Sequence, residues 1–522
     1  MVFRPTLLAC CGLVTLQAVE PAVVAPPAPM PTPAVAPTPA QGQAAAVPRA
    51  TLPPTSRVVL HLAQHQRASL RWEDSPFPLL LKTPWGTNLI REAAKRPSLY
   101  VLLTQLALAE QATVGIEVLG QQPEGHVLAT VSDSTLAEAL TERKAVVTVD
   151  GNAPQAALRA TLGMQAYRLD EAFRQGGPGP NMRWSWDDLL PLPAKELQAP
   201  IARGVDAELC WSQRAAWAPG GAIFRVTWTL EPFGLRERVR ISGCPAVATS
   251  SGPNVYADRA VFAGLPGSTI WAVTCGSVPT LVANFPLAES ACSQWATGLG
   301  LGPWSELAPR LGSVLLRVEQ GAPLPSLTLE ISMPQETGAT FLALLDEHQQ
   351  FSADPDGTHV GVLGFVPVQA GWRDGRLVLT TLAGGVTAAI TRPGGFLAQP
   401  GVTDALKELP TGELLFAGLS RSDESWAALT GLAPWLVRRK PELATLSNDL
   451  RKVGIYGFIA LHRDQDALVI DAGGLCGGPV SASALITGFL RTSFPRDGER
   501  RPRPAKPAAP APSNENPKQI EF

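Results

Sequence analysis

The chain contains 522 residues, of which 45% are apolar and 17% are charged, and its formal net charge is −2. This charge balance excludes an overall electrostatic attraction to nucleic acid. The length and apolar content are enough for two or three domains with substantial buried cores.

The first residues have the order of a secretory signal peptide. Arg4 supplies positive charge, Leu7–Leu16 is apolar, and Ala18 is a small residue at the expected cleavage position. The apolar segment is much shorter than the ~20 residues of a membrane-spanning helix. We therefore expect residues 1–18 to be removed, with no transmembrane anchor left behind, and the protein to be periplasmic or extracellular. Lipidation at Cys10 stays open as an alternative to simple cleavage.

Two proline-rich segments flank the folded part of the chain. Residues 19–50 consist largely of proline, alanine and valine, which favour extended conformations and bury no core, so we expect a disordered linker. Residues 496–522 are expected to form a disordered, basic and proline-rich tail, which either contacts anionic lipid or cell-wall polymer or is simply solvated. Its basic residues are Arg496, Arg500, Arg501, Arg503 and Lys506.

The N-terminal lobe, residues 51–180, is expected to mix strands and helices. The expected elements are a strand over Arg57–Leu62, helices over Phe77–Lys82, Trp85–Lys95 and Ser98–Glu110, a strand over His126–Val131, a short helix near Leu136–Leu140, and a strand over Ala145–Val149. An amphipathic helix is predicted from Asn152 through Phe173, because its apolar residues repeat with a helical period. A Gly/Pro segment at 176–180 then marks a boundary.

The middle segment, residues 181–310, has a β-like pattern. Phe224–Leu230 alternates apolar and polar residues, and a short turn leads to a return strand. That strand carries Val239 and Ile241 on one face and arginines on the other, which is typical of a hairpin with one buried and one solvated face. Strands over Ala207–Trp211 and Ile270–Thr274 are expected to extend the same antiparallel sheet.

The C-terminal lobe, residues 311–495, is predicted to have a ββα rhythm. Its hairpins are expected over Val314–Val318 with Leu327–Ile331, Val360–Val368 with Leu377–Leu382, and Ile455–Leu461 with Leu468–Ile470. A further strand is expected over Leu414–Leu419, and helices around Phe341–His348, Trp426–Leu432, Glu442–Lys452 and Ser481–Leu490. Asp374-Gly375 is a strong turn signal within the second hairpin.

A faint internal repeat relates the two lobes. Residues 52–80 and 409–436 both begin with Leu-Pro, continue with a strand and a short polar loop, and end in a tryptophan-bearing helix. Repetition indicates two related lobes, and the alternative is chance similarity between Leu-rich and Pro-rich segments. The expected fold class is therefore α+β, with two lobes of antiparallel sheet packed with helices.

The starts of these lobes also carry a resemblance. Pro76–Trp85 has the sequence PFPLLLKTPW, and Ala405–Leu415 has the sequence ALKELPTGELL. In these segments the chain resembles a group of exported bacterial proteins of unknown function, built from repeated lobes of curved antiparallel sheet with packed helices. The resemblance implies an architecture for the lobe starts, and it brings no known chemistry.

Arginines of the predicted middle hairpin form a candidate anion-binding site. They are Arg225, Arg236, Arg238 and Arg240. A guanidinium group binds phosphate or carboxylate in a bidentate manner. The alternative is a solvated sheet face, partly neutralised by Glu231 and Glu237, since antiparallel sheets commonly show a polar face to water.

Cys476 is a candidate reactive thiol, because it lies in the segment GGLCGG directly before a predicted helix. The alternative is that these glycines only turn the chain from strand to helix. The other mature cysteines are interpreted as small buried apolar residues, with their disulfide connectivity left open. They are Cys210, Cys244, Cys275 and Cys292, of which the nearest pairs in sequence are Cys210 with Cys244 and Cys275 with Cys292.

No catalytic residue, metal ligand or cofactor is predicted. His61 and His65 lack the glutamate of the zinc-protease motif, and we expect them to be surface or capping residues. We therefore expect an exported, non-catalytic binding or scaffolding protein of the cell envelope, with an envelope partner or an apolar ligand and not nucleic acid. The alternatives are an exported hydrolase with a cleft that joins Asp187, Asp188 and one histidine, and a periplasmic carrier of an apolar or lipid ligand.

Overall fold

The structure is a computed structural model. It describes residues 54–62, 71–84, 87, 111–119, 122–131, 156–161, 189–199, 204–215, 218–244, 256–285, 292–293, 296–297, 303–321, 325–349, 351–363, 366–432, 438, 445, 448–451, 456–464, 466–475 and 478. The expected signal peptide, linker and tail lie outside the described residues. So do the 176–180 boundary, the elements expected over 98–110, 136–149 and 481–490, and nearly all of Trp85–Lys95.

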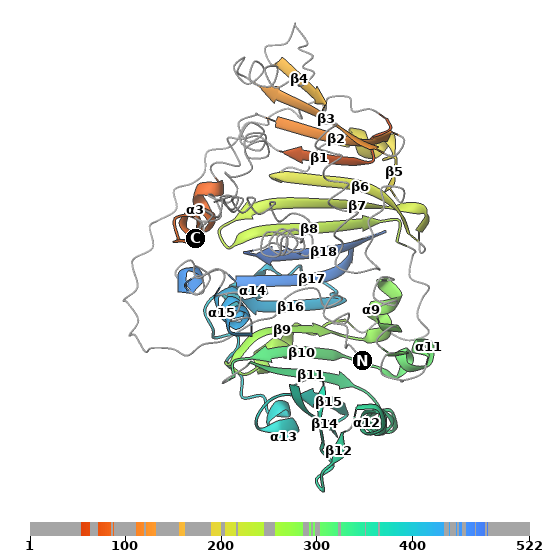
Figure 1. Cartoon of the computed structure of the whole chain (residues 1–522), viewed down its shortest axis with the longest axis vertical. Helices are drawn as coiled ribbons and strands as arrows, with labels where there is room; N and C mark the ends of the chain where they lie inside the picture. Colours follow the sequence, from red (N-terminus) through yellow and green to blue (C-terminus); the bar gives the residue numbers. More distant parts are fainter. Residues whose placement is uncertain are drawn as a thin grey trace, which may run out of the picture.

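The described strands belong to one 18-stranded sheet in which every pairing is antiparallel. Figure 1 shows them crossing the molecule one above another along its long axis. The strands are β1 (Val58–Leu62), β2 (Gln111–Leu119), β3 (Gln122–Val131), β4 (Ala156–Thr161), β5 (Leu189–Leu190), β6 (Ala207–Ala215), β7 (Ala218–Glu231), β8 (Gly234–Ser242), β9 (Thr269–Cys275), β10 (Val314–Glu319), β11 (Ser326–Ser332), β12 (Ser352–Ala353), β13 (His359–Leu363), β14 (Val366–Arg373), β15 (Arg376–Thr380), β16 (Phe416–Arg421), β17 (Tyr456–Asp464) and β18 (Ala467–Gly474).

The order of the strands in space differs from their order along the chain. The pairings run β4-β3-β2-β1-β6-β7-β8-β18-β17-β16-β9-β10-β11-β15-β14-β13-β12, and β5 also pairs with β6. The last hairpin of the described chain, β17–β18, therefore lies between β8 and β16. This arrangement brings the N-terminal and C-terminal strands together near the middle of the sheet.

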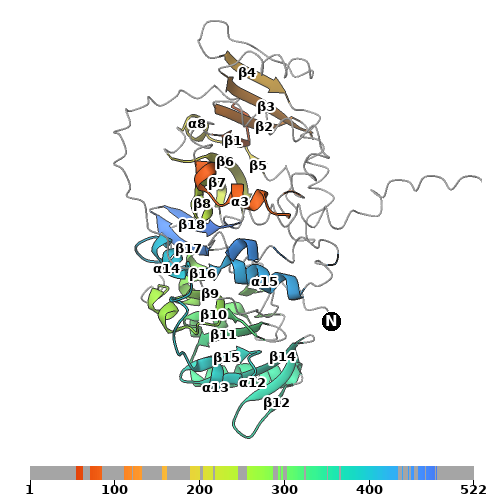
Figure 2. The ribbon, with the colours of Figure 1, turned by 90° about the vertical axis from the view of Figure 1, so that its left-hand side faces the viewer.

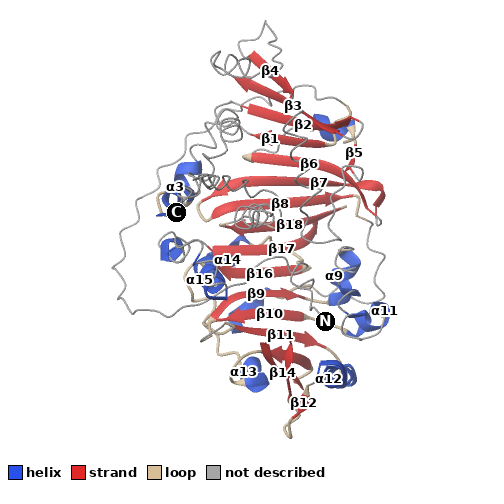
Figure 3. Cartoon of the chain, in the orientation of Figure 1, coloured by secondary structure: helices blue, strands red, loops and turns tan. Residues whose placement is uncertain are grey.

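Helices pack on both faces of the sheet, and Figure 3 shows them in blue beside the red strands. They are α3 (Phe77–Leu81), α8 (Ala194–Gln198), η2 (Arg259–Gly264), α9 (Val278–Asn284), α11 (Trp304–Leu307), η3 (Ala308–Arg310), α12 (Gln335–Gln349), α13 (Gly385–Ile390), α14 (Val402–Glu408) and α15 (Ser422–Leu432). The fold is thus of the mixed α+β class, mostly antiparallel sheet with some helices.

We call the face of the sheet that carries Arg225, Arg238 and Asp471 the arginine face. In its C-terminal half, Phe262 of η2 and Val402 of α14 pack in one buried cluster with strand residues of β16 and β17. The opposite face is covered by α9, α11 and α12 through a second cluster, and by α15 through a third. In Figure 2, α14 and α15 accordingly lie on opposite sides of the sheet.

Most expected strands and helices within the described residues are present, and the turn at Asp374-Gly375 is confirmed. The φ angles there are 49° and 76°, which is the backbone of a two-residue hairpin turn. The single strand expected over Val360–Val368 is instead two strands, β13 and β14, paired with each other. Four strands, β12 to β15, therefore separate α12 from α13.

The helix expected from Asn152 is wrong where the structure describes it. Residues 156–161 form β4, which pairs with β3 from Ala156 opposite Val131 to Thr161 opposite His126. This pairing gives the backbone of β3 a hydrogen-bonded neighbour on its outer edge, so the tertiary context overrides the apolar spacing of the segment.

Candidate functional site: the arginine row

Strand β8 carries the candidate arginines because its side chains alternate between the two faces of the sheet. Val239 and Ile241 are buried on the opposite face, where they face Ile470 and Leu468 of β18. The arginines at 236, 238 and 240 therefore lie on the arginine face. Arg225 of β7 joins them there, since it pairs directly with Arg240.

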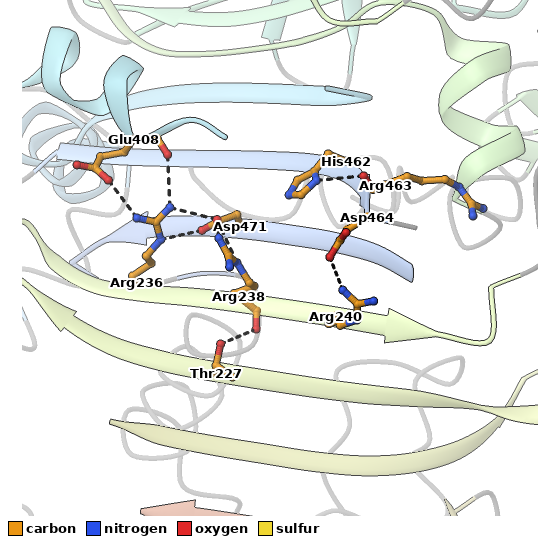
Figure 4. Close-up of polar contacts among 9 residues, drawn as sticks. All are labelled: Thr227, Arg236, Arg238, Arg240, Glu408, His462, Arg463, Asp464 and Asp471. Carbon is orange, nitrogen blue, oxygen red and sulfur yellow. Dashed lines mark hydrogen bonds and ion pairs between the residues drawn. The ribbon is translucent and has the colours of Figure 1, made fainter. Parts of the chain in front are cut away.

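Asp471 of β18 is the centre of this row (Figure 4). Its side chain is 0% exposed. Arg236 donates from Nε to Oδ1 at 3.0 Å and from Nη2 to Oδ2 at 3.1 Å. Arg238, which lies directly opposite Asp471 in the ladder, donates from Nη2 to Oδ2 at 2.6 Å. Two guanidinium groups thus share one fully buried carboxylate.

Arg236 has further partners beyond Asp471. Its Nη1 donates to Glu408 Oε2 at 3.1 Å, and its guanidinium carbon lies 5.4 Å from the centre of the Phe458 ring. Burial lowers the pKa of Arg236, but the pull of Asp471 and Glu408 outweighs it, so the pKa is raised above its ordinary value. Arg236 therefore stays charged and connects β8 to β18, β17 and α14.

The other two arginines are also bound to carboxylates of the chain. Arg240 donates to Asp464 and lies 3.5 Å from Asp466. Arg225 Nη2 donates to Glu196 of α8 at 2.5 Å, and its Nη1 lies 3.8 Å from the buried Glu208. Burial lowers the pKa of Arg225, but the attraction of Glu208 and Glu196 outweighs this effect, so the pKa is raised above its ordinary value.

The two glutamates expected to neutralise the row behave differently. Glu237 is fully buried on the opposite face, where it accepts a hydrogen bond from Trp228 Nε1 at 2.9 Å, so its expected contact with the arginines is wrong. Burial raises the pKa of Glu231, while Arg236 and Arg71 lower it. Glu231 is therefore within electrostatic reach of the row.

Each of the four arginines faces at least one carboxylate of the same protein. An added anion has to compete with Asp471, Glu408, Asp464 or Glu196 for the guanidinium groups. Anion binding by the row stays a prediction. In the structure these side chains form ion pairs between strands and helices that are distant in sequence.

The glycine segment near Cys476 is explained by close packing. A Cβ atom on Gly473 would lie 2.3 Å from the Phe458 ring and 2.6 Å from the Phe233 ring, and one on Gly478 would lie 2.6 Å from Glu237 Oε1. Small residues are thus required where β18 ends. Cys476 itself lies outside the described residues, so its reactivity stays a prediction.

The described histidines lie in different strands and helices. His61 is 1% exposed and pairs with the equally buried Glu208 across β1 and β6, so its expected surface position is wrong. His359 Nδ1 lies 2.8 Å from Asp346 Oδ1. Within the described part of the chain, no group of three or more histidine, cysteine or acidic side chains is placed to hold a metal ion. His65, Asp187 and Asp188 lie outside that part.

The described cysteines are buried or partly buried, as interpreted from the sequence. Cys210 packs with Val59 on the arginine face, whereas Cys244 packs with Val239 and Ile241 on the opposite face. The sheet therefore separates Cys210 from Cys244. Burial raises the pKa of the Cys244 thiol, against a smaller lowering by Arg463.

A second polar cluster was not predicted from the sequence. Arg317 of β10 is fully buried and donates to Glu319 at 2.7 Å and to Glu330 at 2.6 Å. Glu330 also accepts from Arg376 at 3.0 Å and from Arg392 at 2.5 Å. The only sequence signal is the presence of charged residues at alternate positions in otherwise apolar strands.

Comparison with protein-family models, with curated proteins and with solved structures finds no match for this chain. Among the described residues, no helix combines the length and apolar character that crossing a membrane requires.

Proposed function

We propose that this protein is an exported, non-catalytic binding or scaffolding protein of the cell envelope. The observation that carries the proposal is the continuous antiparallel sheet, which extends through seventeen consecutively paired strands from β4 to β12. Such a sheet offers a long, rigid surface to a partner. The order of residues 1–18 supports export, and the proline-rich linker supports a folded part held away from its point of attachment.

The chemistry of the arginine row supports the same proposal. Its guanidinium groups are held by carboxylates of the chain, and Arg236 and Arg238 join β8 to β18 through Asp471. Arginines that are paired with carboxylates of the same chain stabilise the surface of the sheet on which they lie. A catalytic site would instead direct such groups at a substrate.

A carrier of an apolar ligand is the second candidate, and one surface favours it. On the face opposite the arginine face, β6 and β7 carry Trp211 stacked on Phe224 with ring centres 4.9 Å apart. Leu209, Trp228 and Ile470 are only partly buried beside them. An apolar ligand binds to surfaces lined in this way.

We further infer that the sheet contains two related lobes. The strand orders β3-β2-β1-β6-β7-β8 and β18-β17-β16-β9-β10-β11 are equivalent, with β1 and β16 in corresponding positions. These two strands are the ones that share the Leu-Pro repeat of residues 52–80 and 409–436. A duplicated scaffold of this kind suits a binding surface better than a single reaction centre.

The proposal is tested with the full chain produced in a bacterial host. Fractionation and N-terminal sequencing should find a mature protein that begins at Val19 outside the cytoplasm. A photo-crosslinking residue at the exposed Val362 or Leu327 should capture one reproducible envelope component, whereas the same group at the buried Leu377 should capture none. Recovery in the cytoplasm with residues 1–18 intact would overturn the export claim.

Native mass spectrometry of the purified protein distinguishes the second candidate, since a carrier should retain a lipid that solvent extraction releases.

A further inference from the structure

Two junctions in the sheet have the same design. At the β8–β18 junction, Asp471 is 0% exposed and is held by Arg236 and Arg238. At the β11–β15 junction, Glu330 is 2% exposed and is held by Arg376. Each junction joins strands that are far apart in the sequence, and each has one buried carboxylate on the arginine face. We call them the first seam and the second seam.

The two seams carry their charges in opposite order. In the first seam the arginines belong to β8 and the carboxylate to β18. In the second seam the carboxylate belongs to β11, and Arg376 belongs to β15. Arg317 and Arg392 complete the shell around Glu330. The edge of β8 therefore presents positive charge to its partner β18, and the edge of β11 presents negative charge to its partner β15.

This order of charges distinguishes correct from incorrect pairing. If β8 paired with β15, Arg238 would meet Arg376, and if β11 paired with β18, Glu330 would meet Asp471. Burying Glu330 together with Asp471 would be strongly unfavourable. Arg238 and Arg376 are partly exposed, so their repulsion would be weaker. The apolar residues of the opposite face do not discriminate in this way, because Val239 and Ile470 are complementary to many apolar neighbours.

We propose that the buried charges of the two seams determine which strand edges pair. We also propose that each seam opens independently of the other. The first seam closes the sheet, because β17–β18 is the last described hairpin and β8 is its partner on one side. Loss of the buried carboxylate in one seam weakens that seam and leaves the other closed.

Hydrogen exchange on the full chain tests the proposal. Asp471→Asn should raise amide exchange rates in β8 and β18 by about tenfold or more, with β11 and β15 as in the unchanged protein. Glu330→Gln should have the reverse effect. Both variants replace a carboxylate by an amide of the same shape, so each is the matched control for the other. Identical patterns in the two variants, or faster exchange spread evenly over the sheet, would overturn the proposal.

Two substitutions at partly exposed arginines provide a second test in case a substitution of a buried carboxylate prevents folding. Arg238 is 53% exposed and Arg376 is 39% exposed, so Arg238→Gln and Arg376→Gln remove one donor each from the first and second seam. Each should speed exchange at its own seam, by a smaller factor than loss of the carboxylate. Lys407→Gln, which removes an exposed pair with Asp404 outside both seams, should change neither. Equal effects of all three variants contradict the proposal.

Discussion

At the scale of single residues, strand β18 carries one charged and one small side chain in closely packed surroundings. Asp471 is enclosed by guanidinium groups, and Gly473 lies against two aromatic rings. The same short strand, β18, therefore contributes both a charge contact and a close approach. Its residues are more constrained than its sequence pattern indicates.

Gly473→Ala should lower the free energy of unfolding by about 1–3 kcal/mol, the usual cost of overpacking a buried site. The added Cβ atom would overlap the rings of Phe458 and Phe233. Urea unfolding followed by tryptophan fluorescence measures the change. Gly220→Ala is the control, because nothing lies within 4 Å of its Cβ position in β7. Equal stability of the two variants would contradict the packing argument.

Tyr456 should ionise at a higher pH than an ordinary tyrosine. Burial, followed by Glu408, Asp404 and Glu231, raises its pKa to about 12, against a lowering by Arg236. Ultraviolet titration of the folded protein should lose this late step in Tyr456→Phe. Since the raised pKa favours the neutral phenol in the folded state, its contribution to stability is complete below the unfolded pKa of about 10 and is lost as the pH rises towards 12. An unchanged titration in the variant contradicts this assignment.

At the scale of secondary-structure elements, local turn chemistry decides the hairpins. The β14–β15 turn places Asp374 and Gly375 at positive φ, a conformation that asparagine, aspartate and glycine adopt most readily. The Gly375 Cβ position is empty of neighbours. A substitution of Gly375 therefore tests the cost of the left-handed backbone without a contribution from steric overlap.

Gly375→Ala should destabilise the protein by about 1–2 kcal/mol through the left-handed backbone alone. Asp374→Asn should leave stability close to that of the unchanged protein, because asparagine tolerates the same conformation. Thermal and urea unfolding of both variants measure the difference. A tolerated alanine at position 375 would show that the turn relaxes to another type.

At the scale of the whole molecule, the sheet is held together by the insertion of β17–β18 between β8 and β16. Without this hairpin, β8 and β16 would each expose an unpaired edge. Exposed strand edges pair readily with other chains. The C-terminal hairpin therefore covers the edges of both β8 and β16.

A chain that ends at residue 455 should self-associate, as measured by analytical ultracentrifugation. The matched control ends at residue 495, which removes only the expected tail and keeps β17–β18. The control should sediment like the full chain. A shortened chain that remains monomeric and folded would show that other residues cover the edges of β8 and β16.

The sequence by itself determined the elements whose signals are local. The β7–β8 hairpin, α12 and the Asp374-Gly375 turn were predictable because alternation, helical period and turn residues act over a few positions. The alternation of β8 also predicted that Arg236, Arg238 and Arg240 share a face. Neighbours within one strand or hairpin are sufficient to specify such features.

Only the tertiary structure decided which strand edges meet. It showed that residues 156–161 pair with β3 as a strand, and that Asp471, more than 230 residues from Arg236, lies between two arginines. A backbone edge pairs equally well with many strands, so local patterns do not select its partner. The partner is selected by complementary charge and packing on the two faces, and these arise only when distant segments come together.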